Sequence, residues 1–237
     1  MKIGLVSYLS KNRDISFNMQ QIELAFKSSK GKVDLLCFGE AFIQGFDSLC
    51  WNYEIDKDIA LSLSSDLISQ LKKWSIQYGI SLITGYIERD QEKLYSSCVV
   101  ISNGEIVHNY RRISKGWKEY TKTDEHYCEG DEVSSFYING KEITLAICGD
   151  LWEFPNRFKT NHLLIWPIYV NYSIDEWNSG VVDEYAAQAA LVANDALMIN
   201  PIDDNPINHG GSFYFHNGQT ISQIPFDSEE ILIVDIG

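Results

Sequence analysis

In the N-terminal third of the chain, continuous apolar runs alternate with segments in which apolar residues recur at helical spacing. Apolar runs typical of buried strands cover Lys2–Tyr8, Val33–Phe42 and Ile80–Ile87. Between these runs, apolar residues recur every three or four positions and indicate two helices; they are Met19, Ile22, Phe26, Leu67, Leu71, Trp74 and Tyr78. Strand–helix–strand order predicts parallel pairing of the three strands through helical crossovers.

Asn-Gly pairs mark three further turns, at Asn103-Gly104, Asn139-Gly140 and Asn217-Gly218. Each pair is flanked by residues of strand character, and Asn-Gly suits the positive φ angles of a type I′ hairpin. Hairpins beside parallel units predict mixed sheets and exclude an all-α or all-β design. Helices separated by two groups of strands fit an α/β fold, a four-layer αββα sandwich with two mixed β-sheets.

A third helical stripe lies in the C-terminal third and is surrounded by alanines; its members are Trp177, Val181, Tyr185, Ala189 and Val192. The stripe predicts a helix that packs in the core. The stretch 203–210 that follows reads as one polar loop. Because no linker, low-complexity tract or charge block divides the chain, residues 1–237 are expected to form a single domain.

Composition narrows the class of protein. The 237 residues are 45% hydrophobic, enough for a large core, and no 18-residue apolar run indicates a membrane span. The formal charge of −14 argues against nucleic-acid binding, which requires clustered Lys and Arg. The five cysteines are odd in number and irregularly spaced, which favours reduced thiols in a cytoplasm. Without Cys-x-x-Cys or glycine-loop motifs, neither a metal nor a nucleotide cofactor is expected.

Cys148 is the first candidate for chemistry, because an apolar strand is expected to break into a turn there. The run Glu142–Trp152 reads as a strand that stops at Gly149-Asp150. A thiol at that point is presented at the sheet edge where ligands bind, and the Gly149 N–H is placed to hold an oxyanion. The alternative is a buried structural cysteine, a common role for a free thiol.

Glu40 lies near the end of another apolar strand, Val33–Phe42. Period-two alternation places Leu36, Phe38 and Glu40 on one face and Cys37 on the other. A carboxylate among apolar neighbours is the setting that a general base near neutral pH requires. A solvated glutamate at the start of a loop is the alternative.

A group of cations follows the first predicted hairpin, in a chain that is otherwise rich in acidic residues. It occupies Val107–Glu119 and contains Arg111, Arg112, Lys115 and Lys118. Cations near a Cys–Glu pair would favour the thiolate and neutralise charge that develops on a substrate oxygen. A solvated, cationic strand end is the alternative.

In this order of carboxylate, cation and cysteine, the chain resembles the nitrilase superfamily of carbon–nitrogen hydrolases, whose members present a Glu-Lys-Cys triad at three strand ends. The resemblance rests on Phe38–Phe42, Tyr110–Arg112 and Ile147–Leu151. Shorter matches extend it from Lys2 to Ile236, at Gly130-Asp131, Trp166-Pro167, Glu184–Ala190, Met198–Asn200 and Gly210–Ser212. Independently of the element order, the resemblance implies the αββα fold.

One departure from the family bears on the chemistry. The family's lysine follows an arginine in a Tyr-Arg-Lys pattern, and this chain has Arg112 at that place. Arginine is a permanently charged planar fork, whereas lysine is a compact point charge that can change protonation state. Three alternatives stay open: Arg112 stabilises the oxyanion, Lys118 or Lys115 brings an ammonium from the following loop, or activity is altered or lost.

The resemblance also implies a mechanism and a class of substrate. Glu40 would accept the Cys148 proton as the sulfur attacks an amide-like carbon, and Gly149 with Arg112 or Lys118 would hold the oxyanion. Ammonia or an amine would leave, and water would hydrolyse the thioester. The expected substrate is a small amide or N-carbamoyl compound, because amide hydrolysis is the commoner superfamily activity; a nitrile is the alternative.

Three further residues are candidates around the triad. Glu125, five residues before Gly130, is a candidate for the second carboxylate that family members use to order the site, with an exposed loop glutamate as the alternative. Trp152 and Asn171 follow the nucleophile strand and the next strand, so they are candidates to line a substrate pocket. Aromatic residues in such places are more often core.

Two rival classes of function remain, together with an expectation about assembly. One rival is a non-catalytic binding or assembly protein on the same scaffold. The other is a Cys–His hydrolase that uses one of five histidines as its base, namely His108, His126, His162, His209 or His216. No motif links any of these histidines to Cys148.

Because the superfamily usually associates through the face near the nucleophile turn, a homodimer or higher homo-oligomer is expected.

Overall fold

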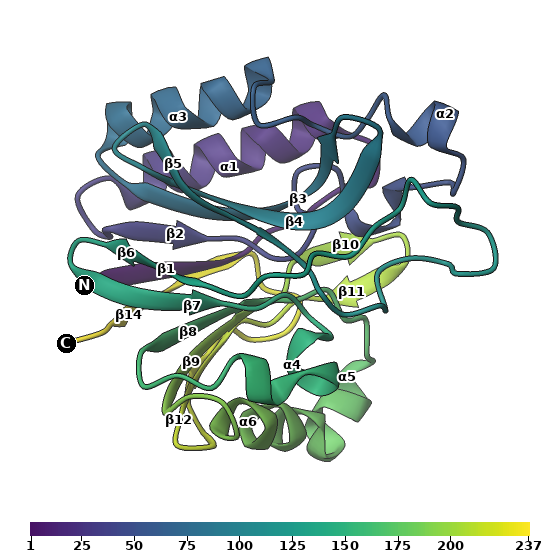
Figure 1. Ribbon diagram of the computed structural model, residues 1–237. Coiled ribbons are helices and arrows are strands. Elements are labelled where there is room, and N and C mark those ends of the chain that lie inside the picture. Colours follow the sequence, from purple (N-terminus) through teal and green to yellow (C-terminus); the bar gives the residue numbers. More distant parts are fainter.

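The computed structural model describes residues 1–237 and shows two β-sheets stacked face to face between two layers of helices (Figure 1). The first sheet has the strand order β14-β1-β2-β3-β4-β5, with bounds Glu230–Asp235, Lys2–Ser7, Leu35–Cys37, Ser81–Asp90, Lys93–Ser102 and Glu105–Arg111. The second has the order β13-β12-β9-β8-β7-β6, with bounds Gln219–Gln223, Phe213–His216, Asp195–Ile199, Leu163–Pro167, Lys141–Leu145 and Ser135–Ile138. The predicted αββα fold class is confirmed.

The helices cover the outer faces of the sheets (Figure 1). Helices α1 (Ile15–Ser29) and α3 (Asp66–Tyr78) lie over the first sheet. Every member of the predicted stripe of α1 is buried, whereas α3 buries Leu71 and Trp74 and packs Leu67 and Tyr78 partly buried against the same cluster. Over the second sheet lie α4 (Asp150–Glu153), α5 (Ile174–Glu176), a π-helical turn (Trp177–Val181) and α6 (Val182–Ala190). Shorter elements are a 3₁₀ turn (Phe46–Ser48), α2 (Tyr53–Asp56) and a second 3₁₀ turn (Pro155–Arg157).

Both sheets are mixed, as predicted. Strands β1, β2 and β3 pair in parallel in the middle of one sheet, and β7, β8 and β9 do so in the other. Antiparallel strands flank each parallel core, and the three predicted Asn-Gly hairpins connect β4 to β5, β6 to β7 and β12 to β13. Both residues of each turn have positive φ, for example 51° at Asn103 and 77° at Gly104, as a type I′ turn requires.

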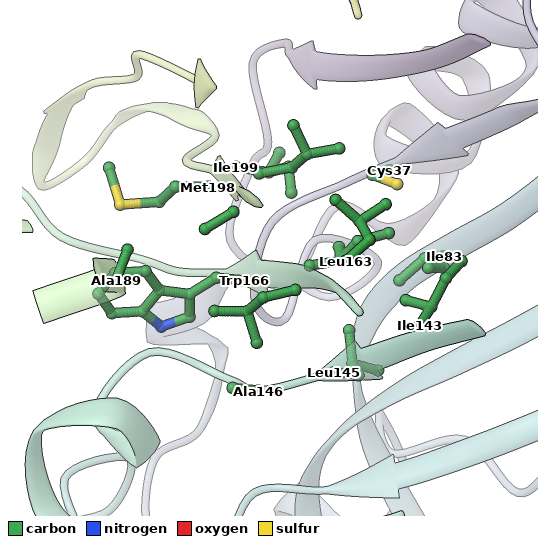
Figure 2. Packing of buried hydrophobic residues seen from close by; sticks show 14 of the residues in the cluster. Cys37, Ile83, Ile143, Leu145, Ala146, Leu163, Trp166, Ala189, Met198 and Ile199 are labelled. Atoms are coloured by element: carbon green, nitrogen blue, oxygen red, sulfur yellow. The ribbon is translucent and has the colours of Figure 1, made fainter. Parts of the chain in front are cut away.

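The inner faces of the two sheets form the main core. Cys37 on β2 and Ile83 on β3 belong to one cluster with Ile143 and Leu145 on β7, and all four side chains are fully buried. Figure 2 shows these side chains approaching one another from the two sheets. Burying each of them contributes on the order of 1–3 kcal/mol, so the two sheets hold each other in a fixed relative position.

Two predictions about local structure need correction. The third stripe packs in the core as predicted, with Trp177, Tyr185 and Ala189 buried, but its helix is not continuous. Gly180 takes a φ of 135°, and residues 177–181 form a π-helical turn before α6 begins at Val182. The stretch 203–210 is not a loop, since β10 (Ile202–Asp204) and β11 (Ile207–His209) pair within it as a short hairpin. None of the helices combines the length and the apolar composition that a membrane span needs.

Candidate active site

Glu40 lies in a turn that leaves the first sheet and contacts the second. Strand β2 ends at Cys37, and the Glu40 N–H donates to the carbonyl of Ile168, just beyond β8, at 3.2 Å. The predicted shared face is therefore wrong at its last member: Phe38 packs beneath α1 and α3, whereas Glu40 turns toward the other sheet. The carboxylate is buried, with 1% of the residue exposed.

Arg112 directly follows β5 and meets Glu40 in a buried ion pair. Its Nη1 donates to Glu40 Oε1 at 2.9 Å, and Ser96 Oγ donates to the same oxygen at 2.7 Å. Its Nε donates to Ser114 Oγ at 2.7 Å. The other carboxylate oxygen of Glu40, Oε2, is buried without a hydrogen-bond partner. One oxygen of Glu40 is thus held in place, while the second is free to act on a proton.

The charge of Arg112 is fixed by its acidic surroundings. Burial by itself lowers the pKa of Arg112, but the charges of Glu40, Cys148 and Asp150 offset this, and the pKa stands above its usual value. The guanidinium is therefore a permanent cation of this cluster at any working pH.

Cys148 occupies a sharp turn three residues after β7. Its φ of 43° lies in the left-handed region, which costs a non-glycine residue on the order of 1–2 kcal/mol. Its N–H donates to the Pro167 carbonyl at 2.9 Å, and its own carbonyl accepts from Trp166 Nε1 at 2.9 Å. The sulfur lies 3.8 Å from the Tyr169 carbonyl oxygen. These contacts with the end of β8 hold the turn in its strained conformation.

The thiol of Cys148 is protonated near neutral pH. Burial raises its pKa to about 12; Arg112 opposes this effect, and the charge of Glu40 adds to it. The thiol therefore needs a proton acceptor at the moment it reacts, since a preformed thiolate is scarce. Glu40 lies near the thiol, because the N–H groups of Glu40 and Cys148 donate to the consecutive carbonyls of Ile168 and Pro167, and it carries one unpartnered oxygen.

Asp150 joins the turn of Cys148 to the segment that carries Arg112. The carboxylate is fully buried, and burial raises its pKa, while the charge of Arg112 opposes that rise. Its oxygens accept four hydrogen bonds, from Ile113 N–H (3.1 Å), Ser114 N–H (2.8 Å), Tyr110 hydroxyl (2.6 Å) and Ile147 N–H (2.8 Å). The backbones on either side of the cation and the thiol are thereby bonded to one side chain.

Gly149 follows the thiol, and its N–H donates to no group within the chain. A free N–H next to a nucleophile is the arrangement of an oxyanion-binding donor. The structure therefore brings together four predicted residues, Glu40, Arg112, Cys148 and Gly149, from three separate loops.

Lys118 and Glu125 are not brought into this cluster. The Lys118 ammonium pairs with Glu129 at 3.0 Å and donates to the Tyr127 carbonyl. Glu125 is exposed, and only its main-chain carbonyl accepts hydrogen bonds. Lys115 is also exposed. The Lys118 ammonium is thus bound by residues of the loop that follows Arg112 and does not reach Cys148.

Trp152 and Asn171 differ in their relation to the thiol. Trp152 on α4 is 42% exposed, and its ring packs on Tyr185 with a centroid distance of 5.2 Å. Tyr185 in turn stacks on Trp166 with a centroid distance of 5.2 Å, and Trp166 Nε1 donates to the Cys148 carbonyl. Asn171 is exposed, and its side chain makes no hydrogen bond within the chain.

Sequence reasoning did not find Ser96 and Ser114, the two serines that orient the Glu40–Arg112 pair. Both are buried. Ser114 stands two residues after Arg112 in an irregular segment, and Ser96 lies in a strand far from either partner in sequence. No local pattern distinguishes them from other serines, since the role of Ser96 depends on a contact between separate elements and that of Ser114 on the direction of the Arg112 side chain.

The histidines lie apart from the thiol. Four of them pair with carboxylates of their own neighbourhood, in the pairs His126–Asp124, His162–Glu142, His209–Asp227 and His216–Asp195. His108 stacks on Phe136 at 4.9 Å, and burial lowers its pKa. None contacts Cys148. No group of three or more His, Cys, Asp or Glu side chains is arranged to hold a metal ion.

Two mixed sheets between helical layers, with a thiol, a carboxylate and a cation gathered where strands end, define an α/β protein of the nitrilase type. The carbon–nitrogen hydrolase family model matches residues 2–237, and the chain belongs to that family. It is a hydrolase that acts on carbon–nitrogen bonds.

Relatives named for both amide and nitrile chemistry resemble the chain at low identity. An (R)-stereoselective amidase from Pseudomonas sp is 25% identical over 219 residues, covering 90% of this chain and 76% of the relative. An arylacetone-specific nitrilase from Alcaligenes faecalis is 22% identical over 273 residues, covering 100% and 76%. Among solved structures, a mutant of the Nesterenkonia AN1 amidase has a TM-score of 0.81 at 18% identity, covering 100% of this chain and 90% of that chain.

Proposed function

We propose that this protein is a cysteine-dependent amidase that cleaves a small amide or N-carbamoyl compound through a thioester intermediate. The observation that carries the proposal is the buried Glu40–Arg112 ion pair beside Cys148, with Glu40 Oε2 left unpartnered. A structural ion pair would have its hydrogen-bonding groups satisfied, because a buried acceptor without a partner costs about 1–3 kcal/mol. A free carboxylate oxygen near a protonated thiol has the chemistry of a general base.

In the first half of the reaction, Glu40 Oε2 takes the thiol proton as the sulfur of Cys148 bonds to the carbonyl carbon. The carbonyl π electrons move to oxygen, and the Gly149 N–H and the Arg112 guanidinium stabilise the resulting oxyanion. The carbon–nitrogen bond then breaks, Glu40 returns its proton to the nitrogen, and ammonia or an amine departs. Cys148 is left as a thioester and Glu40 as a carboxylate.

In the second half, water takes the place of the departed amine. Glu40 accepts a proton from the water as its oxygen bonds to the thioester carbon, and the same two donors hold the second oxyanion. The carbon–sulfur bond breaks, the sulfur recovers a proton from Glu40, and the acid or carbamic acid is released. A single carboxylate thus serves as base and acid in each half, which requires that it never leave its position.

The proposal is tested by measuring ammonia release from a panel of small amides and N-carbamoyl compounds, with nitriles alongside. We expect release from amides or carbamoyl compounds, and acyl-enzyme of the corresponding mass after a rapid quench. Silence across the whole panel would favour a binding protein on the same scaffold, and release from nitriles alone would replace the amidase proposal with a nitrilase.

Arg112 and Lys118 are expected to differ sharply when each is replaced. Arg112→Ala should lower kcat by about 10²–10³-fold, because it removes an oxyanion donor and leaves Glu40 without its partner. Lys118→Ala should change kcat by less than about fivefold, since its ammonium is bound to Glu129 and to a carbonyl of its own loop. Steady-state kinetics on the best amide distinguish the two; an equal loss in both variants would place the lysine in the site.

The reactivity of Cys148 is expected to rise steeply at alkaline pH. Because burial holds the pKa of the thiol at about 12, the thiolate fraction, and with it the rate of alkylation by iodoacetamide, should increase about tenfold for each pH unit between pH 7 and 10. Peptide mass spectrometry follows the alkylation of Cys148 separately from that of the exposed Cys50. A plateau in the rate below pH 9 would show that the thiolate forms early and needs no base.

A further inference from the structure

The guanidinium of Arg112 fills space that two glycines leave open. A Cβ atom built on Gly149 would lie 2.5 Å from Arg112 Nη2 and 3.1 Å from Ser114 Oγ. A Cβ atom on Gly116 would lie 3.1 Å from the same Nη2. Real Cβ atoms essentially never approach another heavy atom more closely than 3.0 Å, so any side chain at position 149 would displace the guanidinium.

The backbone gives no reason for a glycine at position 149. Its φ of −63° and ψ of −11° lie in the right-handed region that every L residue adopts readily. Glycine here increases the entropy lost on folding by roughly 0.5–1 kcal/mol relative to alanine. A glycine is required here because Arg112 Nη2 occupies the space that a side chain at position 149 would fill.

We propose that Gly149, Gly116 and Ser114 form a slot for a guanidinium, and that this slot makes Arg112 the working cation of the site in place of a lysine. Ser114 Oγ fixes Nε and Glu40 fixes Nη1, so the planar group has one allowed orientation. The side-chain hydrogen bonds of Arg112 use Nε and Nη1 and leave Nη2 without a partner. Nη2 lies beside Gly149, the residue that follows the thiol. The slot therefore holds the unpartnered Nη2 next to Gly149, where it is available to a substrate oxygen, and its three members are positioning residues for Arg112.

This inference rests on the proposed function for its catalytic readout, and a double-mutant cycle tests it. Gly149→Ala should lower kcat by about 10²-fold with KM changed less than about threefold, because the displaced guanidinium no longer meets the oxyanion. The same change in an Arg112→Lys background should lower kcat by less than about threefold, since the narrower ammonium leaves room for a methyl group. A much smaller loss of kcat in the Arg112→Lys background would show that Gly149 is required because of Arg112.

Two milder variants keep the inference testable if Gly149→Ala does not fold. Gly116→Ala should cost several-fold in kcat, because its Cβ atom demands a shift of only a few tenths of an ångström. Ser114→Ala should cost about tenfold, because Nε loses its acceptor. Both losses should nearly vanish in the Arg112→Lys background. Equal losses in the two backgrounds, for any of the three variants, would overturn the slot.

Alkylation of Cys148 separates failure of the slot from failure of the proposed function. Because Arg112 lowers the pKa of the thiol, displacing the guanidinium should slow alkylation by iodoacetamide at pH 9 about tenfold in Gly149→Ala. The Arg112→Lys background should show less than a twofold change. This pattern in a protein that releases no ammonia from any amide would leave the slot standing and refute the amidase. Ammonia release with equal alkylation rates in both backgrounds would do the reverse.

Discussion

Replacement of Cys148 by alanine is expected to abolish ammonia release, with a loss in kcat on the order of 10⁴–10⁶-fold. In the proposed mechanism the sulfur forms the covalent bond that divides the reaction into two halves, and the one unpartnered carboxylate oxygen of the site, Glu40 Oε2, is already assigned the role of base. Steady-state ammonia assays measure the loss, and intact-protein mass spectrometry shows whether an acyl group still accumulates. The variant should keep the fold, since a methyl side chain fits the space that the thiol leaves.

Cys50→Ser is the matched control for this substitution. Cys50 is exposed, and its sulfur donates to Asp56 at 3.2 Å, a bond that a serine hydroxyl can replace. Its activity should stay within about twofold of the wild type. Turnover retained in Cys148→Ala, or an acyl group found on another cysteine, would remove the nucleophile role from Cys148.

Local sequence patterns predict most of the fold because the elements that they describe are stabilised locally. Ser65 caps the start of helix α3 by accepting from the Ile68 N–H, and Gly79 caps its end in the left-handed conformation. The type I′ turns follow from Asn-Gly pairs in the same way. The helix interruption at Gly180 was missed because an apolar stripe with helical spacing continues across it, and one glycine does not reveal a φ of 135°.

The path of the chain around Glu40 depends on contacts that no local pattern contains. A Cβ atom on Gly39 would lie 2.5 Å from a Pro201 side-chain atom, and one on Gly85 would lie 2.4 Å from the Gly39 carbonyl oxygen. Two close approaches, one to β3 and one to the chain beyond β9, therefore end the strand early and turn Glu40 toward the second sheet. Period-two alternation assumes an unbroken strand and gives the wrong face for this residue.

The candidate site shows the same division between local and long-range information. The residues that we propose to react lie in short motifs at expected strand ends, so their types and order suffice to propose them. Of the residues that orient them, Ser96 bonds to Glu40 across 56 positions that only the assembled fold brings together, whereas Ser114 is two positions from Arg112 and is identified only by the direction that the guanidinium takes. Glu125 is the opposite case. Its spacing from Gly130 makes it a candidate for the site, but the fold leaves its side chain exposed.

Replacement of Glu40 by glutamine is expected to lower turnover and, at the same time, to raise the reactivity of the Cys148 thiol toward alkylation. The amide oxygen still accepts from Arg112 and Ser96, so the geometry is kept, but the neutral side chain cannot take a proton. We expect kcat to fall about 10³–10⁴-fold. In the same variant the thiol should become more reactive, because the charge of Glu40 raises the pKa of Cys148 and Arg112 lowers it. Alkylation by iodoacetamide at pH 8 should therefore become about tenfold faster.

Opposite changes in turnover and alkylation distinguish a lost base from a damaged site. A distorted pocket would slow both reactions, whereas removal of a general base slows only the one in which a proton must move during attack. Glu105→Gln is the matched control, because the Glu105 side chain is 79% exposed at the start of β5 and should leave both rates within about twofold. Turnover preserved in Glu40→Gln would transfer the role of base to another group. Slower alkylation in the same variant would show that Glu40 serves mainly to hold Arg112 in place.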